Sequence, residues 1–101
     1  MREFVVEQYL PAAGGAAAAQ RAAAARRAAE ELRREGIRVR FVRSIFIPED
    51  ETCIHLYRAD SIEAVRAAVT RASLPLERIA EAVTCVPKDN GDRLRDGLEA
   101  P

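Results

Sequence analysis

Apolar and polar residues alternate most regularly between Arg40 and Arg58, in the stretch RFVRSIFIPEDETCIHLYR. Alternation with a period of two is typical of a β-strand with one buried face. The polar segment PEDE at residues 48–51 divides the stretch into two runs, which we interpret as an antiparallel hairpin. The expected cross-strand pairs are Ile47 with Thr52, Ile45 with Ile54 and Arg43 with Leu56 on one face, and Phe46 with Cys53, Ser44 with His55 and Val42 with Tyr57 on the other.

We predict that the first of these faces packs against the core, because it is mostly aliphatic. The alternating row Ile37, Val39, Phe41, Ile45 and Ile47 supports this assignment. Arg43 interrupts the row, and an unpaired buried guanidinium is very costly, so the position requires either a β-bulge or a carboxylate partner. The second face mixes apolar bulk with groups that donate, accept or bind metals. We therefore predict that it is open and carries the functional site.

The rest of the chain predicts four further elements. They are a strand over Arg2 to Leu10, an alanine-rich helix over residues 16–35 that ends at Gly36, a helix over residues 61–72 introduced by an Asp60 cap, and a strand over residues 79–86. In the first strand, Phe4 and Val6 are expected to face the core. Residues 1–87 would then form one domain, and the polar residues 88–101 a flexible C-terminal tail.

The predicted order is β-α-β-β-α-β, which is the ferredoxin-like pattern. It implies an α+β fold with a four-stranded antiparallel sheet and two helices on one face. An uncovered face that carries apolar residues usually marks a partner surface. We therefore expect a homodimer in which two sheets pack face to face, a dimeric α+β barrel with a ligand cavity between them.

The charge balance and the cysteine content limit the classes of partner and site that we expect. Sixteen basic and sixteen acidic residues cancel, so no net charge would attract the chain to nucleic acid or to a membrane surface. We find no signal segment and no run of about 20 apolar residues, so we expect a cytoplasmic protein. Cys53 and Cys85 lack metal-binding spacing and are interpreted as buried free thiols, with a thiolate contribution to a metal left open.

The candidate site combines residues from three predicted strands. If the first and third strands are neighbours, Glu7 and Tyr9 share the open face with His55 and Tyr57. Neutral imidazole suits Ni²⁺ or Zn²⁺, and a carboxylate can complete such a site. One His55 and one Glu7 are too few ligands for tight binding. A twofold axis near the cluster would double them to a four-ligand shell.

Two other interpretations remain open. His55 could act as a general acid or base, with Glu7 orienting it and a hydroxyl of Tyr57 binding the substrate, in a cofactor-independent oxygenase, cyclase or isomerase of small hydrophobic metabolites. His55 and Tyr57 could instead only line a dimer interface, hydrogen-bonded to Ser44 or Glu7. The residues expected to contact a small ligand are Tyr9, Arg43, Ser44, Phe46 and Tyr57.

Short motifs along the chain resemble a known family. They are Val6-Glu7 with Tyr9-Leu10-Pro11, Arg43-Ser44, Ile47 to Asp50, Leu56-Tyr57, Ser61 with Glu63 to Arg66, and Leu74-Pro75. With them the chain resembles small bacterial proteins of unknown function that include actinobacterial nickel-binding proteins. The resemblance implies a ferredoxin-like fold, homodimers formed through the sheets and, for some members, binding of nickel. The chain has His55 where relatives often carry cysteine, and Val69 where they often carry histidine.

Overall fold

The computed structural model describes residues 1–87, which form four strands and two α-helices. The elements are β1 (Arg2–Tyr9), α1 (Gly15–Arg34), β2 (Val39–Ile47), the 3-10 turn η1 (Pro48–Asp50), β3 (Thr52–Ala59), α2 (Ile62–Arg71) and β4 (Arg78–Ala82). The predicted order of strands and helices is confirmed. The strand predicted over residues 79–86 is shorter than expected, and the predicted tail at 88–101 lies outside the described residues.

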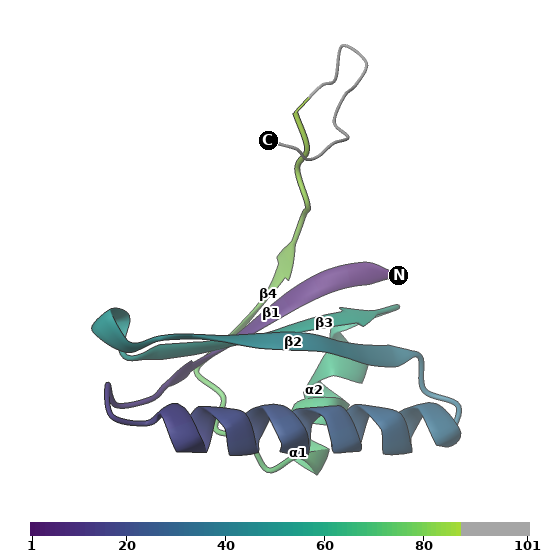
Figure 1. Cartoon of the computed structure of the whole chain (residues 1–101). Helices are drawn as coiled ribbons and strands as arrows, with labels where there is room; N and C mark the ends of the chain where they lie inside the picture. Colours follow the sequence, from purple (N-terminus) through teal and green to yellow (C-terminus); the bar gives the residue numbers. More distant parts are fainter. Residues whose placement is uncertain (88–101) are drawn as a thin grey trace.

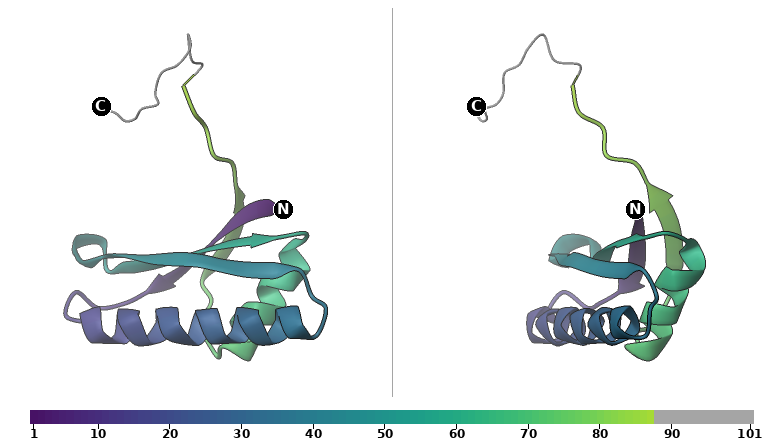
Figure 2. Two further views of the ribbon diagram at one scale, coloured as in Figure 1. Left: turned by 45° about the vertical axis from the view of Figure 1, so that its right-hand side comes forward. Right: turned by 90° about the vertical axis from the view of Figure 1, so that its right-hand side faces the viewer.

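The strands form one antiparallel sheet in the order β2-β3-β1-β4. Both helices pack against the same face of this sheet, so the domain has two layers (Figure 1). Within residues 1–87, no helix covers the opposite face, as the views in Figure 2 also show. After β4, residues 83–87 run away from the two-layer body (Figure 1). Neither α1 nor α2 is long and apolar enough to cross a membrane.

The helices follow from local sequence. α1 consists largely of alanine, the residue with the highest helix propensity, and its small buried side chains let the helix approach the sheet closely. Gly36 follows its end with a φ of 93°, which glycine adopts without steric strain. α2 is capped by Ser61, whose hydroxyl accepts a hydrogen bond from the Ala64 amide at 3.2 Å. The cap is therefore Ser61, whereas the sequence had suggested Asp60.

The hairpin of β2 and β3 has nearly the predicted register. Five expected pairs are confirmed, from Ile47 with Thr52 to Arg43 with Leu56. The sixth is wrong, because Tyr57 lies opposite Phe41 instead of Val42. The register shifts between Phe41 and Arg43, which is the β-bulge that Arg43 was expected to require.

This bulge explains why the predicted faces are inverted. An extra residue in β2 changes the phase of the alternation, so Phe41 stays in the core while Arg43 and Ile45 turn to the opposite side. Ser44, Phe46, Cys53, His55 and Tyr57 therefore lie on the face covered by the helices, which we call the covered face. Ile45, Ile54 and Leu56 lie on the other face, which we call the open face.

The core forms on the covered face. Phe4 and Val6 of β1 are 1% and 0% exposed, as predicted, and they pack with Phe41, Tyr57 and residues of both helices. Val69 of α2 also belongs to this core and is 3% exposed.

Candidate functional site

His55 lies in the middle of the covered face and is 0% exposed. Its ring is held from both sides: the Ser44 hydroxyl lies 2.5 Å from Nδ1, and Gln8 Oε1 lies 3.0 Å from Nε2. Arg21 of α1 donates a hydrogen bond from Nη1 to the same Gln8 oxygen, at 3.2 Å. A chain of hydrogen bonds thus connects α1, β1, β3 and β2.

The direction of these bonds follows from Arg21, because a guanidinium only donates. Arg21 fixes the Gln8 Oε1 atom as an acceptor, so His55 donates to it from Nε2. The neutral ring then carries its lone pair on Nδ1, where it accepts a hydrogen bond from the Ser44 hydroxyl. Both nitrogens of His55 are engaged within the protein.

Burial and the nearby Arg21 charge lower the pKa of His55 to about 4. Burial is the larger cause, because it disfavours the charged imidazolium. His55 is therefore neutral at pH 7, which does not suit the general acid or base role considered from the sequence. No solvent reaches the ring, so a dissolved substrate cannot contact it in this conformation.

Two buried polar atoms of the covered face have no partner among the described residues: Gln8 Nε2 and the hydroxyl of Tyr57. Burial raises the pKa of Tyr57, and it also raises the pKa of Cys53. The Cys53 sulfur lies 3.9 Å from His55 Nε2. The covered face therefore keeps its histidine, tyrosine and cysteine in their neutral forms.

The structure does not bring His55 and Glu7 together. Glu7 lies on the open face, directly opposite Ile54, and its carboxylate accepts a hydrogen bond from Arg78 at 2.6 Å. Alternation along β1 and β3 separates the two residues by the thickness of the sheet. The predicted cluster of Glu7, Tyr9, His55 and Tyr57 on one face is therefore wrong.

The residues around His55 do not fit a metal centre. Its only lone pair in the ring plane already accepts a hydrogen bond from Ser44. Within residues 1–87, no group of three or more His, Cys, Asp or Glu side chains gathers where it could hold a metal ion. A twofold axis at the open face would not double the ligand set, because His55 lies behind its own sheet.

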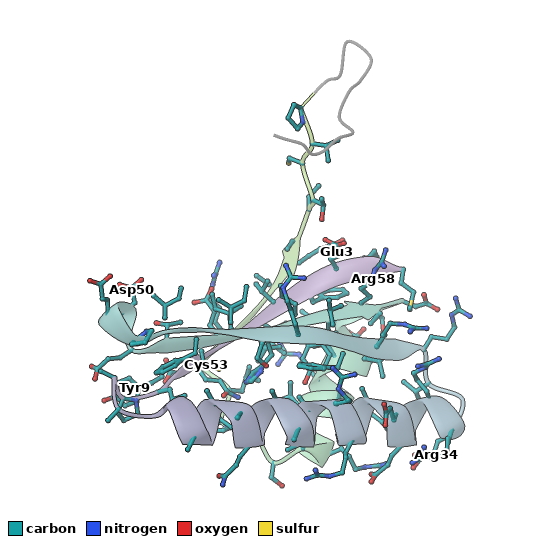
Figure 3. The ribbon with its side chains drawn as sticks, in the orientation of Figure 1. Glu3, Tyr9, Arg34, Asp50, Cys53 and Arg58 are labelled. Carbon is teal, nitrogen blue, oxygen red and sulfur yellow. The ribbon has the colours of Figure 1, made fainter. Side chains whose placement is uncertain are left out.

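The open face has a different chemistry. A row of facing residues crosses it from Arg43 through Leu56 and Val5 to Ala80. The next row crosses from Arg40 through Arg58 and Glu3 to Ala82. Beside these rows lies a hollow of about 360 Å³, bordered by residues that include Glu3, Arg43, Leu56 and Arg58. Figure 3 shows Glu3 and Arg58 on the helix-free side, and Cys53 between the sheet and α1.

The predicted ligand-binding residues are thus divided between the faces. Arg43 is exposed at the hollow, and Tyr57 borders it although its side chain is buried in the core. Tyr9 is 53% exposed at the end of β1. Ser44 bonds to His55, and Phe46 packs against the small core cluster that contains Cys53. These last two residues do not contribute to the open face.

Sequence reasoning missed four residues with a role in these arrangements. Gln8 and Arg21 belong to the hydrogen-bond chain of His55, and Glu3 and Arg58 border the hollow. Gln8 had a usable signal, because it continues the buried row of Phe4 and Val6 with a polar side chain. The others depend on which elements meet in space.

Comparison with known proteins identifies the family. Searches of curated proteins and of solved structures gave no significant match. A family model described as nickel responsive protein SCO4226-like matches residues 4–82. That range spans β2, β3, β4 and both helices entirely, and β1 except for its first two residues. The chain therefore belongs to the SCO4226-like family of nickel responsive proteins.

Proposed function

We propose that this protein is a homodimer that binds a small ligand between its sheets, on the ferredoxin-like plan expected from its element order. The observation that carries the proposal is the apolar centre of the open face. Val5, Ile54 and Leu56 are only partly covered there, and Ile45 is 39% exposed. Exposed apolar faces of this kind usually serve as interaction surfaces.

A second copy of the chain suits this face better than solvent does. The sheet is broad, and the two helices of residues 1–87 form a layer on one of its sides (Figure 2). The segment after β4 also presents large apolar side chains, with Val83 80% and Val86 79% exposed. A small domain buries a modest fraction of its surface alone, so pairing of two open faces adds apolar burial that one chain lacks.

The hollow supports the second part of the proposal. It opens on the face that we assign to the dimer, so a partner sheet would enclose it further. Ligand sites occur preferentially at such interfaces and combine apolar walls with a few polar groups. Leu56 and Val83 form apolar parts of the wall of the hollow, and Arg43 and Arg58 provide its polar groups.

Membership of a nickel responsive family supports a link between this protein and nickel. We infer that such a link does not use His55 and Glu7 as a shared ligand pair, because they lie on opposite faces. A role of His55 as a general base is also disfavoured, since its ring is buried and its pKa is about 4.

Sedimentation velocity at micromolar concentration tests the dimer. The chain has a mass of 11.1 kDa, so the wild type should sediment as a species of twice that mass. Ile45→Asp places a charge on the open face of an edge strand and should shift the protein to monomer. Ala23→Asp adds the same charge at an exposed position of α1 and should leave the dimer intact. A monomeric wild type would overturn the proposed assembly.

A further inference from the structure

We propose that the hollow on the open face binds a small organic oxyanion, in which a carboxylate or phosphate group is attached to an apolar body. This inference rests on the proposed function, because it names the class of ligand for the same site. Arg43 and Arg58 would bind the oxyanion, and the apolar residues beside them would contact the body of the ligand.

The first support is an excess of positive charge. Arg58 of β3 lies directly opposite Arg40 of β2, and like charges in that position destabilise a sheet. Arg43 is the next residue of β2 to reach the open face after the bulge. Among residues 1–87, the arginines in ion pairs within 4 Å of a carboxylate are Arg2, Arg38, Arg71 and Arg78. Arg40, Arg43 and Arg58 do not belong to that set, so an anion would relieve their mutual repulsion.

One acidic side chain lies close to this group. Glu3 of β1 is directly opposite Arg58 on its other side, and it borders the hollow. Its Oε1 atom accepts a hydrogen bond from the Thr84 hydroxyl, and no ion pair joins it to an arginine within residues 1–87. The charged residues that line the hollow are therefore two arginines, Arg43 and Arg58, and one acid, Glu3, so its lining carries a net positive charge.

The second support is the match between the lining and an amphipathic anion. A guanidinium presents a planar set of donors that fits carboxylate and phosphate oxygens in a bidentate manner. The other walls include Val42, Leu56 and Val83, which offer apolar surface. The volume of about 360 Å³ lies at the lower end of the range for small-molecule sites, roughly 300–1,000 Å³. A bare divalent cation would be repelled by the same charges.

Isothermal titration calorimetry on the full chain tests this with four probes: octanoate, octan-1-ol, inorganic phosphate and nickel chloride. We expect octanoate to bind. Octan-1-ol should bind at least about tenfold more weakly, because it lacks the charge that the guanidinium groups recognise. Phosphate should compete with octanoate but bind more weakly, since it lacks the apolar body. Nickel chloride should not compete with octanoate.

Variants localise the binding. Arg43→Gln and Arg58→Gln should each weaken octanoate binding about tenfold or more, because a charge-assisted hydrogen bond is lost. Arg66→Gln removes an equal charge from an exposed position of α2 and should have no effect. Glu3→Gln should tighten binding several-fold, since it removes the competing carboxylate. Circular dichroism of each variant controls for folding.

The outcomes separate this inference from the proposed function. If octan-1-ol binds as well as octanoate, and Arg43→Gln and Arg58→Gln bind both normally, the oxyanion inference is wrong, while binding of a small ligand by the protein, as in the proposed function, stands. If octanoate binds as expected but wild type sediments as a monomer, the dimer is wrong and the oxyanion site stands. If neither octanoate nor phosphate binds to correctly folded wild type, the oxyanion inference is overturned.

Discussion

The two faces of the sheet are formed by the same strands, but they differ in burial and in chemistry. The covered face holds His55, Tyr57 and Cys53, the residue types that most often carry chemistry in proteins, yet burial keeps all three neutral and away from solvent. On the open face, the arginine and aliphatic side chains that border the hollow have little intrinsic reactivity, but they are accessible. The difference teaches that residue type alone does not mark a site.

The polar groups of the covered face have a structural role instead. The chain of hydrogen bonds from Arg21 through Gln8 and His55 to Ser44 connects α1, β1, β3 and β2. Buried polar groups are stabilising only when they are hydrogen-bonded, and each of these bonds fixes the position of the next. The open face, in contrast, leaves charge and apolar surface for a ligand or a partner.

The largest difference between the two faces is expected in the free energy of unfolding that is lost when a side chain is truncated to alanine. Phe4→Ala on the covered face should lower the free energy of unfolding by about 3–5 kcal/mol, because it leaves a cavity in the core. Leu56→Ala on the open face should lower it by about 1 kcal/mol, because the side chain is only partly covered. Urea denaturation at low and high protein concentration measures both.

The dependence on protein concentration is the control for these two substitutions. In a dimer through the open face, the loss caused by Leu56→Ala should grow as the protein concentration rises, since dimerisation stabilises the wild type more than the variant. The loss caused by Phe4→Ala should not depend on concentration. Equal losses from the two substitutions would contradict the assignment of the faces.

An effect of similar size is expected from pH. The pKa of His55 falls from an ordinary 6.5 to about 4 in the folded chain, so the unfolded chain binds the proton more readily. The stability contributed by the neutral ring is therefore fully present above pH 6.5 and is lost as pH falls toward 4. This component should amount to about 3 kcal/mol, read as the difference between urea unfolding at pH 7 and at pH 4.

His55→Gln is the matched variant, because it keeps hydrogen-bonding capacity without a titrating ring. Carboxylates titrate in both proteins, so only the additional loss in the wild type reports on His55. The imidazole resonances of the single histidine give a second reading. If these resonances titrate near pH 6.5 in the folded protein, the ring is not buried on the covered face.

The smallest effect concerns the hydroxyl of Tyr57, which has no hydrogen-bond partner within residues 1–87. Tyr57→Phe should leave stability unchanged or raise it by up to about 1 kcal/mol, because it removes a buried polar group that lacks a hydrogen bond. Ser44→Ala should instead lower stability by about 1–2 kcal/mol, because it leaves Nδ1 of His55 without its donor. Thermal unfolding compares the two. A clear loss in Tyr57→Phe would show that the hydroxyl has a partner in solution.

The sequence by itself determined the elements and most of the pairing. The period-two runs around PEDE gave the β2–β3 hairpin, and the alanine-rich segment gave α1, because these signals depend on neighbours along the chain. The family resemblance also came from short local motifs, and the family match over residues 4–82 confirms it.

Only the tertiary structure decided which face of the sheet is buried. Both faces of the hairpin carry enough apolar residues to form a core, so local alternation does not choose between them. The bulge after Phe41 and the packing of two helices settled the choice, and they moved His55 from the predicted open site to the interior. The same step brought Arg43 and Arg58 to the open face, because a shift of one residue in β2 turns every later side chain to the other side.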